Sequence, residues 1–193
     1  LLSIDSAIEN YYQQLHLGQR LFNHPNTGGK RRAIAGTLFE QLVNDLVACT
    51  NRTIHSNRFI NSRVVDGLSL PKLQVDKHIS NNDVIESVCE CKTYLDFCYY
   101  KRAISDFNEV LLSPDTPNNL RLAVFTGQRS LDDNSLAFAN AVARQDIGIQ
   151  PELFVVNVVK QRKSTRQLLD PLCASDFDLD KDELQRFIDW VSK

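Results

Sequence analysis

The chain has 193 residues, of which 42% are hydrophobic and 24% are charged, and its formal net charge is −2. Such a chain is long enough to bury a core as one globular domain. The near-neutral charge excludes a strong overall attraction to nucleic acid, so any phosphate contact has to be local. No apolar run approaches the ~18 residues of a membrane helix, and no signal-peptide pattern opens the sequence.

The first half of the chain predicts two helices followed by three strands. Apolar and aromatic side chains recur at helical spacing over residues 3–22, and the stretch NHPNTGGKRR then breaks this helix. Residues 33–48 form a wide apolar face that is typical of an amphipathic helix. We expect the strands at residues 57–65, 73–79 and 84–92.

The second half alternates helices and strands. Tyr100, Ile104, Phe107 and Leu111 mark an amphipathic helix that ends before Pro114. The remaining elements are a buried strand at 120–126, a helix at 133–145, an apolar strand at 152–159 and a final helix from Asp180, its N-cap, to Val191. This order predicts one α/β domain with a mixed sheet flanked by helices.

We expect a single domain over residues 1–193, with the core at 33–160 between an N-terminal segment (1–32) and a C-terminal segment (161–193). The chain begins at Leu1 and contains no Met, so we expect it to be a fragment of a longer protein. Five irregularly spaced cysteines predict free thiols and a reducing, cytoplasmic environment. They include no CxxC pair, which favours buried, inert thiols over a zinc site.

The stretch VDKHISNNDVIESVCECKTY places charged residues on two predicted strands. Glu90 and Lys92 share one face of their strand, because residues i and i+2 point the same way. The face that Asp76 takes depends on the turn. A two-residue loop would put Asp76 opposite Ser87, on the cysteine face, whereas a three-residue loop at 81–83 would put it opposite Val88, on the face of Glu90. A shared site therefore requires an odd loop or a bulge, and asparagine's tolerance of left-handed backbone favours the three-residue loop.

On a shared face, Asp76 and Glu90 would be diagonal neighbours about 7–8 Å apart at the backbone, close enough to bind one Mg²⁺. Such an ion lowers the pKa of bound water and stabilises charge on a phosphoryl oxygen. Lys92 beside it could orient the attacking water and stabilise the developing anion. Phosphodiester hydrolysis needs this set of groups.

The sequence VDKHI followed by ECK, with 13 residues between Asp76 and Glu90, resembles the signature of the PD-(D/E)xK nuclease superfamily. Val75 stands at the position of the signature's Pro. Members often carry a further Glu on the preceding helix, and Glu40 in GTLFEQLV fits that position. The resemblance implies the restriction endonuclease-like fold and a Mg²⁺-dependent endonuclease acting on double-stranded DNA, most simply a type II restriction enzyme. It also implies a homodimer, because cutting both strands takes two active sites.

Local basic clusters are candidate DNA contacts, because they could offset the acidic balance where DNA must lie. They comprise Lys30, Arg31, Arg32, Lys72, Lys77, Lys160, Arg162 and Lys163. The loops at 113–119 and 127–134, with Gln128 and Arg129, are candidates for reading bases.

Other interpretations stay open. The same fold could belong to a repair or junction-resolving nuclease, or to a catalytically silent DNA-binding module. The ExK residues could also lie on the solvated face of an unrelated domain. The stretch DFDLDKDE imitates a calcium loop but lacks the Gly and Glu that an EF-hand needs, so helix capping explains it better.

Overall fold

The computed structural model describes residues 2–21, 28–56, 59–60, 64–65, 67–69, 73–114, 116–159 and 177–193. Its centre is a five-stranded mixed sheet with the order β1-β6-β7-β8-β9. The strands are β1 (Thr53–Ser56), β6 (Lys77–Asn81), β7 (Val84–Lys92), β8 (Arg121–Thr126) and β9 (Glu152–Val155). The first three pair antiparallel, and β7, β8 and β9 run parallel. This confirms the predicted α/β class with a mixed sheet.

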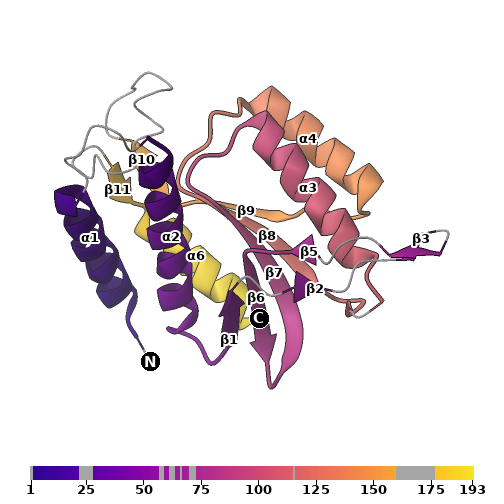
Figure 1. Cartoon of the computed structure of the whole chain (residues 1–193), viewed down its shortest axis with the longest axis horizontal. Coiled ribbons are helices and arrows are strands. Elements are labelled where there is room, and N and C mark those ends of the chain that lie inside the picture. Colours follow the sequence, from indigo (N-terminus) through magenta and orange to yellow (C-terminus); the bar gives the residue numbers. More distant parts are fainter. Residues whose placement is uncertain are drawn as a thin grey trace.

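Helices cover both faces of the sheet (Figure 1). One face carries α1 (Ile4–Leu21), α2 (Gly28–Val47) and α6 (Lys181–Ser192). The other carries α3 (Phe97–Leu111) and α4 (Asp133–Asp146). Three two-stranded sheets complete the described part: β2 (Phe59–Ile60) with β5 (Leu73–Gln74), β3 (Val64–Val65) with β4 (Leu68–Ser69), and β10 (Asn157–Val159) with β11 (Phe177–Leu179).

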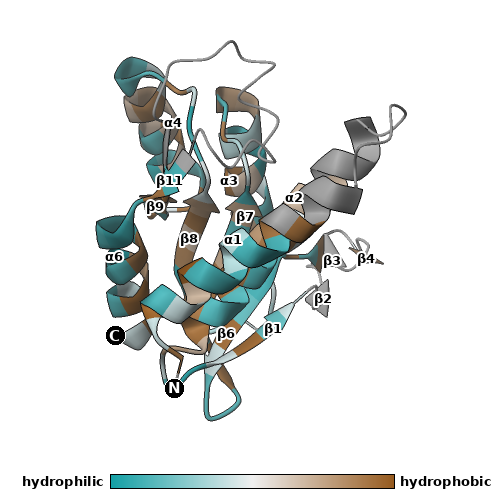
Figure 2. Cartoon of the chain, turned by 90° about the vertical axis from the view of Figure 1, so that its left-hand side faces the viewer, coloured by the Kyte–Doolittle hydropathy of each residue, from teal (hydrophilic) through white to brown (hydrophobic). Residues whose placement is uncertain are grey.

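Each face of the sheet has its own hydrophobic core. Cys89 belongs to the core under α1, α2 and α6, and its neighbour Val88 belongs to the core under α3 and α4. Alternation along β7 therefore puts Glu90 and Lys92 on the α3 face. Strand β8, which lies between β7 and β9, is buried along almost its whole length and is coloured as hydrophobic in Figure 2.

Most predicted elements are confirmed. The N-cap predicted for the last helix is one of them: the Asp180 carboxylate accepts hydrogen bonds from the N–H groups of Asp182 and Glu183 at the start of α6. The start predicted for the second helix is wrong: α2 begins at Gly28, because the cost of about 1 kcal/mol for each glycine does not prevent the good helix formers Lys30, Arg31 and Arg32 from extending the helix. The single strand predicted at 57–65 is also wrong. β1 ends at Ser56, and the short strands β2 and β3 belong to other sheets.

Two predicted strands divide where the chain changes partners. The strand predicted at 73–79 is interrupted at Val75 and Asp76, between β5 and β6. The strand predicted at 152–159 is interrupted at Val156. The N–H of Val156 still donates to Thr126 O on β8, but its carbonyl accepts from Asp180 N, so the chain passes here from the main sheet to the β10–β11 pair.

The β6–β7 hairpin reaches the required register by a bulge. Its loop is Asn82-Asp83, with φ of 48° and 65°, rather than the predicted three residues. Positive φ at both central residues is the geometry of a tight two-residue hairpin turn. The pairing then shifts: Ile79 lies opposite Ser87 but Ser80 lies opposite Ile85, which leaves one extra residue on β7. Beyond this shift Asp76 falls on the face of Glu90, as a shared site requires.

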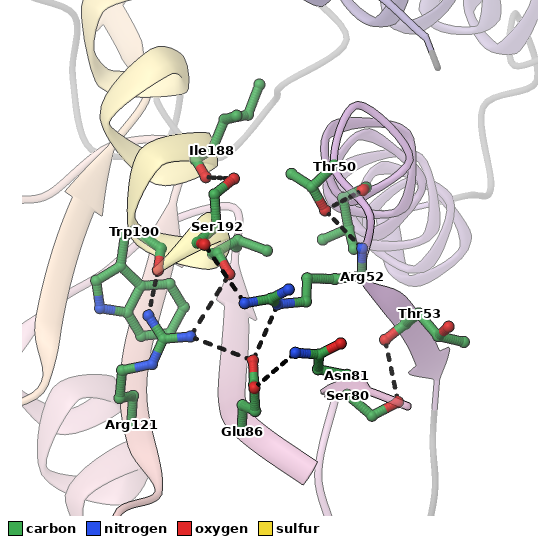
Figure 3. A network of polar contacts seen from close by, with 12 residues as sticks. Thr50, Arg52, Thr53, Ser80, Asn81, Glu86, Arg121, Ile188, Trp190 and Ser192 are labelled. Atoms are coloured by element: carbon green, nitrogen blue, oxygen red, sulfur yellow. Dashed lines mark hydrogen bonds and ion pairs between the residues drawn. The ribbon is translucent and has the colours of Figure 1, made fainter. Parts of the chain in front are cut away.

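The extra residue is Glu86, and its carboxylate anchors the bulge to two arginines (Figure 3). Arg52 Nε lies 2.9 Å from Glu86 Oε2, and Arg121 Nη2 lies 4.0 Å from the same oxygen. Both arginines also reach the last turn of α6, where Arg52 donates to Ser192 O and Arg121 donates to Trp190 O. Cations suit this position because the carbonyl end of a helix is partly negative. The network thus connects the bulge to the C-terminal helix α6.

Side chains of α6 also cover the outer edge of β9. The N–H of Val155 donates to Glu183 Oε2 at 3.1 Å, and Leu153 O accepts a hydrogen bond from Arg186. These are backbone groups that a sixth strand would need for pairing.

Glu86→Ala should lower the free energy of unfolding by about 1–2 kcal/mol, because it removes the counter-charge of two partly buried arginines and the acceptor of the Asn81 side chain. The matched control is Glu152→Ala, which removes a surface pair with Arg186 and should cost under about 1 kcal/mol. Urea unfolding of both variants tests this difference. Equal losses would show that the bulge carboxylate stabilises no more than a surface charge.

Candidate active site

Asp76, Glu90 and Lys92 meet at one end of the β6–β7 hairpin. Asp76 lies in the bend before β6, and the other two residues lie at the end of β7. Each carboxylate accepts an N–H from the other segment: Glu90 Oε1 from Asp76 N at 3.5 Å, and Asp76 Oδ2 from Cys91 N at 2.9 Å. The bulge places Asp76 opposite Glu90, rather than at the predicted diagonal, when the register is continued by one residue.

The ammonium of Lys92 lies between the two carboxylates. Lys92 Nζ is 3.1 Å from Asp76 Oδ2 and 2.6 Å from Glu90 Oε2. The Glu90 side chain is 4% exposed, whereas those of Lys92 and Asp76 are 21% and 27% exposed. The three predicted residues therefore form one cluster, with a buried inner carboxylate and a side that opens to solvent.

The electrostatics of the cluster follow from this partial burial. Burial, and next the negative charge of Asp76, raise the pKa of Glu90 to about 7, against the opposing effect of Lys92. Burial acts to lower the pKa of Lys92, but the carboxylates of Glu90 and Asp76 outweigh it and raise this pKa. Lys92 is thus a stable ammonium, and Glu90 titrates near neutral pH when no other cation is bound.

Neighbouring elements hold the backbone of Lys92. Lys92 pairs with Thr126 of β8, and its carbonyl accepts the N–H of Gly127 at 3.0 Å. A Cβ at Gly127 would lie 2.6 Å from Thr93 O and 2.8 Å from Asn157 Nδ2. Only glycine fits this position, so β8 can approach the end of β7 closely.

Sequence analysis missed Asp106, a half-buried residue of α3 beside the cluster. Burial raises its pKa, while the positive charges of Arg102 and Lys92 oppose that shift and Asp76 adds to it. Asp106 is therefore close enough to Lys92 and Asp76 to interact with them electrostatically. No spacing in the sequence indicates Asp106, because a single acidic residue on an amphipathic helix is common.

Glu40 does not join the carboxylate pair. Its Oε2 lies 3.1 Å from Lys77 Nζ, which also donates to Ser56 Oγ at 2.7 Å. Lys77 pairs with Cys89, on the α2 face of the sheet, opposite the face of Glu90. The structure also buries Lys77 at 1% exposure, against the expectation of a surface contact with DNA. A buried ammonium requires a counter-charge, and Glu40 supplies it.

The other predicted DNA contacts fall mostly outside the described part of the chain. This holds for Lys72, for residues 160–166 with Lys160, Arg162 and Lys163, and for the side chains of Lys30, Arg31 and Arg32. Of the candidate base-reading residues, Gln128 is buried, and Arg129 forms an ion pair with Asp133 at 3.0 Å.

Within the described residues, no group of three or more His, Cys, Asp or Glu side chains is arranged to hold a metal ion. The carboxylate pair therefore offers two protein ligands. The four described cysteines, Cys49, Cys89, Cys91 and Cys98, are free thiols.

No protein-family model matches the chain, and no curated protein matches its sequence. Among the described helices, none combines the length and apolar character that a membrane span requires.

Glu40→Ala should lower the free energy of unfolding by about 3 kcal/mol, because it leaves the buried Lys77 ammonium without its counter-charge. Lys77→Met should lower the free energy of unfolding clearly less, because the remaining Glu40 carboxylate is partly exposed to water. In the double variant, the loss should match that of Lys77→Met alone. Chemical denaturation of the three variants tests this order, and additive losses would contradict the coupling.

The metal-free protein should lose stability, relative to a Glu90→Gln variant, as pH rises from about 4.5 to about 7. The folded-state pKa of Glu90 lies above its ordinary value of 4.5, so the native state holds the proton more tightly. The resulting stabilisation is complete below pH 4.5 and is lost as pH rises through 7, by at most about 3 kcal/mol. Urea unfolding in EDTA at a series of pH values measures it. A constant difference between the two proteins would contradict the raised pKa.

Proposed function

We propose that this chain is a Mg²⁺-dependent endonuclease that hydrolyses phosphodiester bonds of double-stranded DNA. The observation that carries the proposal is the convergence of Asp76 Oδ2 and Glu90 Oε2 on a single cationic centre, Lys92 Nζ. Two carboxylates that already share an ammonium are arranged to share a metal ion.

The donor set fits Mg²⁺. Both groups are hard oxygen ligands, and Mg²⁺ in proteins commonly uses one or two carboxylates, keeping waters or substrate phosphates at its other positions. A pair without a third protein carboxylate meets this need. The side of the cluster that opens to solvent, at Asp76 and Lys92, leaves room for such ligands.

The topology supports the restriction endonuclease-like fold within this proposal. Leaving out the short strands β2 to β5, the chain order is α2, β1, β6, β7, α3, β8, in which an antiparallel unit is followed by a helix and a parallel strand. This order agrees with the resemblance of VDKHI and ECK to the PD-(D/E)xK signature. The motif residues lie on adjacent segments at one end of the hairpin, as a shared site requires.

In the proposed mechanism Asp76 and Glu90 would hold the metal. The chemistry that Mg²⁺ supplies when bound is activation of water and stabilisation of negative charge on a phosphoryl oxygen. Lys92 donates hydrogen bonds to the attacking water or to the developing anion, next to the reacting phosphate. The N–H of Cys91 holds Asp76 in place, and Asp76 N does the same for Glu90. Glu40 acts structurally, through Lys77, and is not assigned to the reaction.

Within this proposal the protein is a type II restriction endonuclease-like enzyme that acts in the cytoplasm as a homodimer. Two copies would be needed to cut both strands. Its DNA contacts would come from the basic segments at 30–32 and 160–163 and from Lys72. Lys77 is left out because it is buried.

Incubation of long phage DNA with the protein, in Mg²⁺ or in EDTA, tests the proposal by gel electrophoresis. We expect discrete fragments only with Mg²⁺. Glu90→Gln should abolish cleavage, Lys92→Met should reduce its rate by about 100-fold or more, and the exposed control Glu9→Gln should cut as the wild type does.

Each other outcome has its own meaning. A smear would indicate a nuclease without site specificity. Intact duplex together with cleaved four-way junctions would favour a junction-resolving enzyme. DNA binding without cleavage of any substrate would favour the silent module, and cleavage by Glu90→Gln would remove this residue from the mechanism.

A further inference from the structure

Lys92 occupies the space in which a shared metal ion would have to lie. Its ammonium is within 3.1 Å of the two oxygens that point at a common centre, Asp76 Oδ2 and Glu90 Oε2. Asp76 Oδ2 also accepts the N–H of Cys91, which limits the room for a further cation at that oxygen. A divalent ion bound between the same two oxygens would lie next to this ammonium, and two positive charges at such a distance repel each other strongly.

We propose that Lys92 is a resident counter-ion of the carboxylate pair and that it must leave Asp76 and Glu90 before a divalent cation can bind there. This inference rests on the proposed metal site and adds how the site is regulated. Lys92 competes with the metal in the free protein, and it becomes available to the substrate when the metal is bound.

The counter-ion has a clear physical role in the metal-free state. Glu90 is almost fully buried and lies beside a second carboxylate, and such a pair is costly to keep ionised without a positive charge. Lys92 supplies that charge. It thus preserves the positions of both carboxylates until a stronger cation replaces it.

The Lys92 side chain is also able to move away from the two carboxylates. Its side chain is 21% exposed and lies at the end of β7, on a flexible four-carbon stem. An ammonium released beside a bound divalent ion is repelled by it and needs a new anion. A DNA phosphate at the site provides one, so metal and DNA should each increase the affinity for the other.

Calorimetric titration with Mn²⁺, in the absence of DNA, tests the competition directly. Lys92→Met keeps the length of the side chain but removes the charge, and it should bind Mn²⁺ at least about tenfold more tightly than the wild type. Lys92→Arg, which retains a positive charge, should show no such gain. The control Lys101→Met removes an exposed positive charge from α3 and should stay within about twofold of the wild type. Equal or weaker binding by Lys92→Met would overturn the inference.

Glu90→Gln separates this inference from the proposed function. Loss of Mn²⁺ binding in Glu90→Gln, with no gain in Lys92→Met, would refute the competition and leave the metal site standing. Unchanged binding in Glu90→Gln, or no binding by any variant, would refute the metal site and the competition with it.

Side-chain NMR of the wild type gives a second measurement that does not depend on a folded Lys92→Met variant. The Cε–Nζ correlation of Lys92, assigned by its absence in Lys92→Arg, should shift saturably as Ca²⁺ is added. It should shift further when a short DNA duplex follows. A Lys92 signal unchanged at Ca²⁺ concentrations that calorimetry shows to saturate the site would contradict displacement of the ammonium.

Discussion

The site depends on one extra residue in a strand. Glu86 is the bulge that shifts the β6–β7 register, and without that shift Asp76 would point to the opposite face of the sheet from Glu90. A bulge exposes backbone and disturbs the ladder, so it needs support from its surroundings. Here the support comes from Arg52 and Arg121, whose other contacts are the last carbonyls of α6. The relative position of Asp76 and Glu90 therefore depends on contacts around Glu86, which lies outside the carboxylate pair.

Two lysines on opposite faces of the hairpin, one buried and one partly exposed, show how differently the fold uses the same side chain. Lys77 is sealed in the core by Glu40 and Ser56, and it joins β6 to α2 and β1. Lys92 contacts two carboxylates, but it lies at a strand end that opens to solvent. The packing around it fixes the ion pair of Lys77 with Glu40. In our proposal a metal ion can replace Lys92 at Asp76 and Glu90. This contrast is the structural basis for assigning Lys92, and not Lys77 or Glu40, to the chemistry.

The sequence predicted the fold class and most elements, because hydrophobic spacing records which face of a helix or strand is buried. Spacing alone also put Glu90 and Lys92 on one face. It could not decide the face of Asp76, because a regular two-residue turn gives one face, a three-residue turn or a two-residue turn with a bulge gives the other, and asparagine suits both turns. It also could not distinguish Glu40 as a ligand from Glu40 as the partner of Lys77, since that choice depends on which residues lie across the sheet. Asp106 was missed because a lone acidic residue on a helix has no pattern of its own.

The covering of β9 by Glu183 and Arg186 has a consequence for assembly. Two copies could in principle join their sheets edge to edge through β9, which would extend the five strands of each into one continuous sheet. This pairing is blocked while the side chains of Glu183 and Arg186 form hydrogen bonds with backbone groups of β9. A second copy would have to approach through a helical layer, which would place helices between the two carboxylate clusters, or through β1 at the far edge of the sheet.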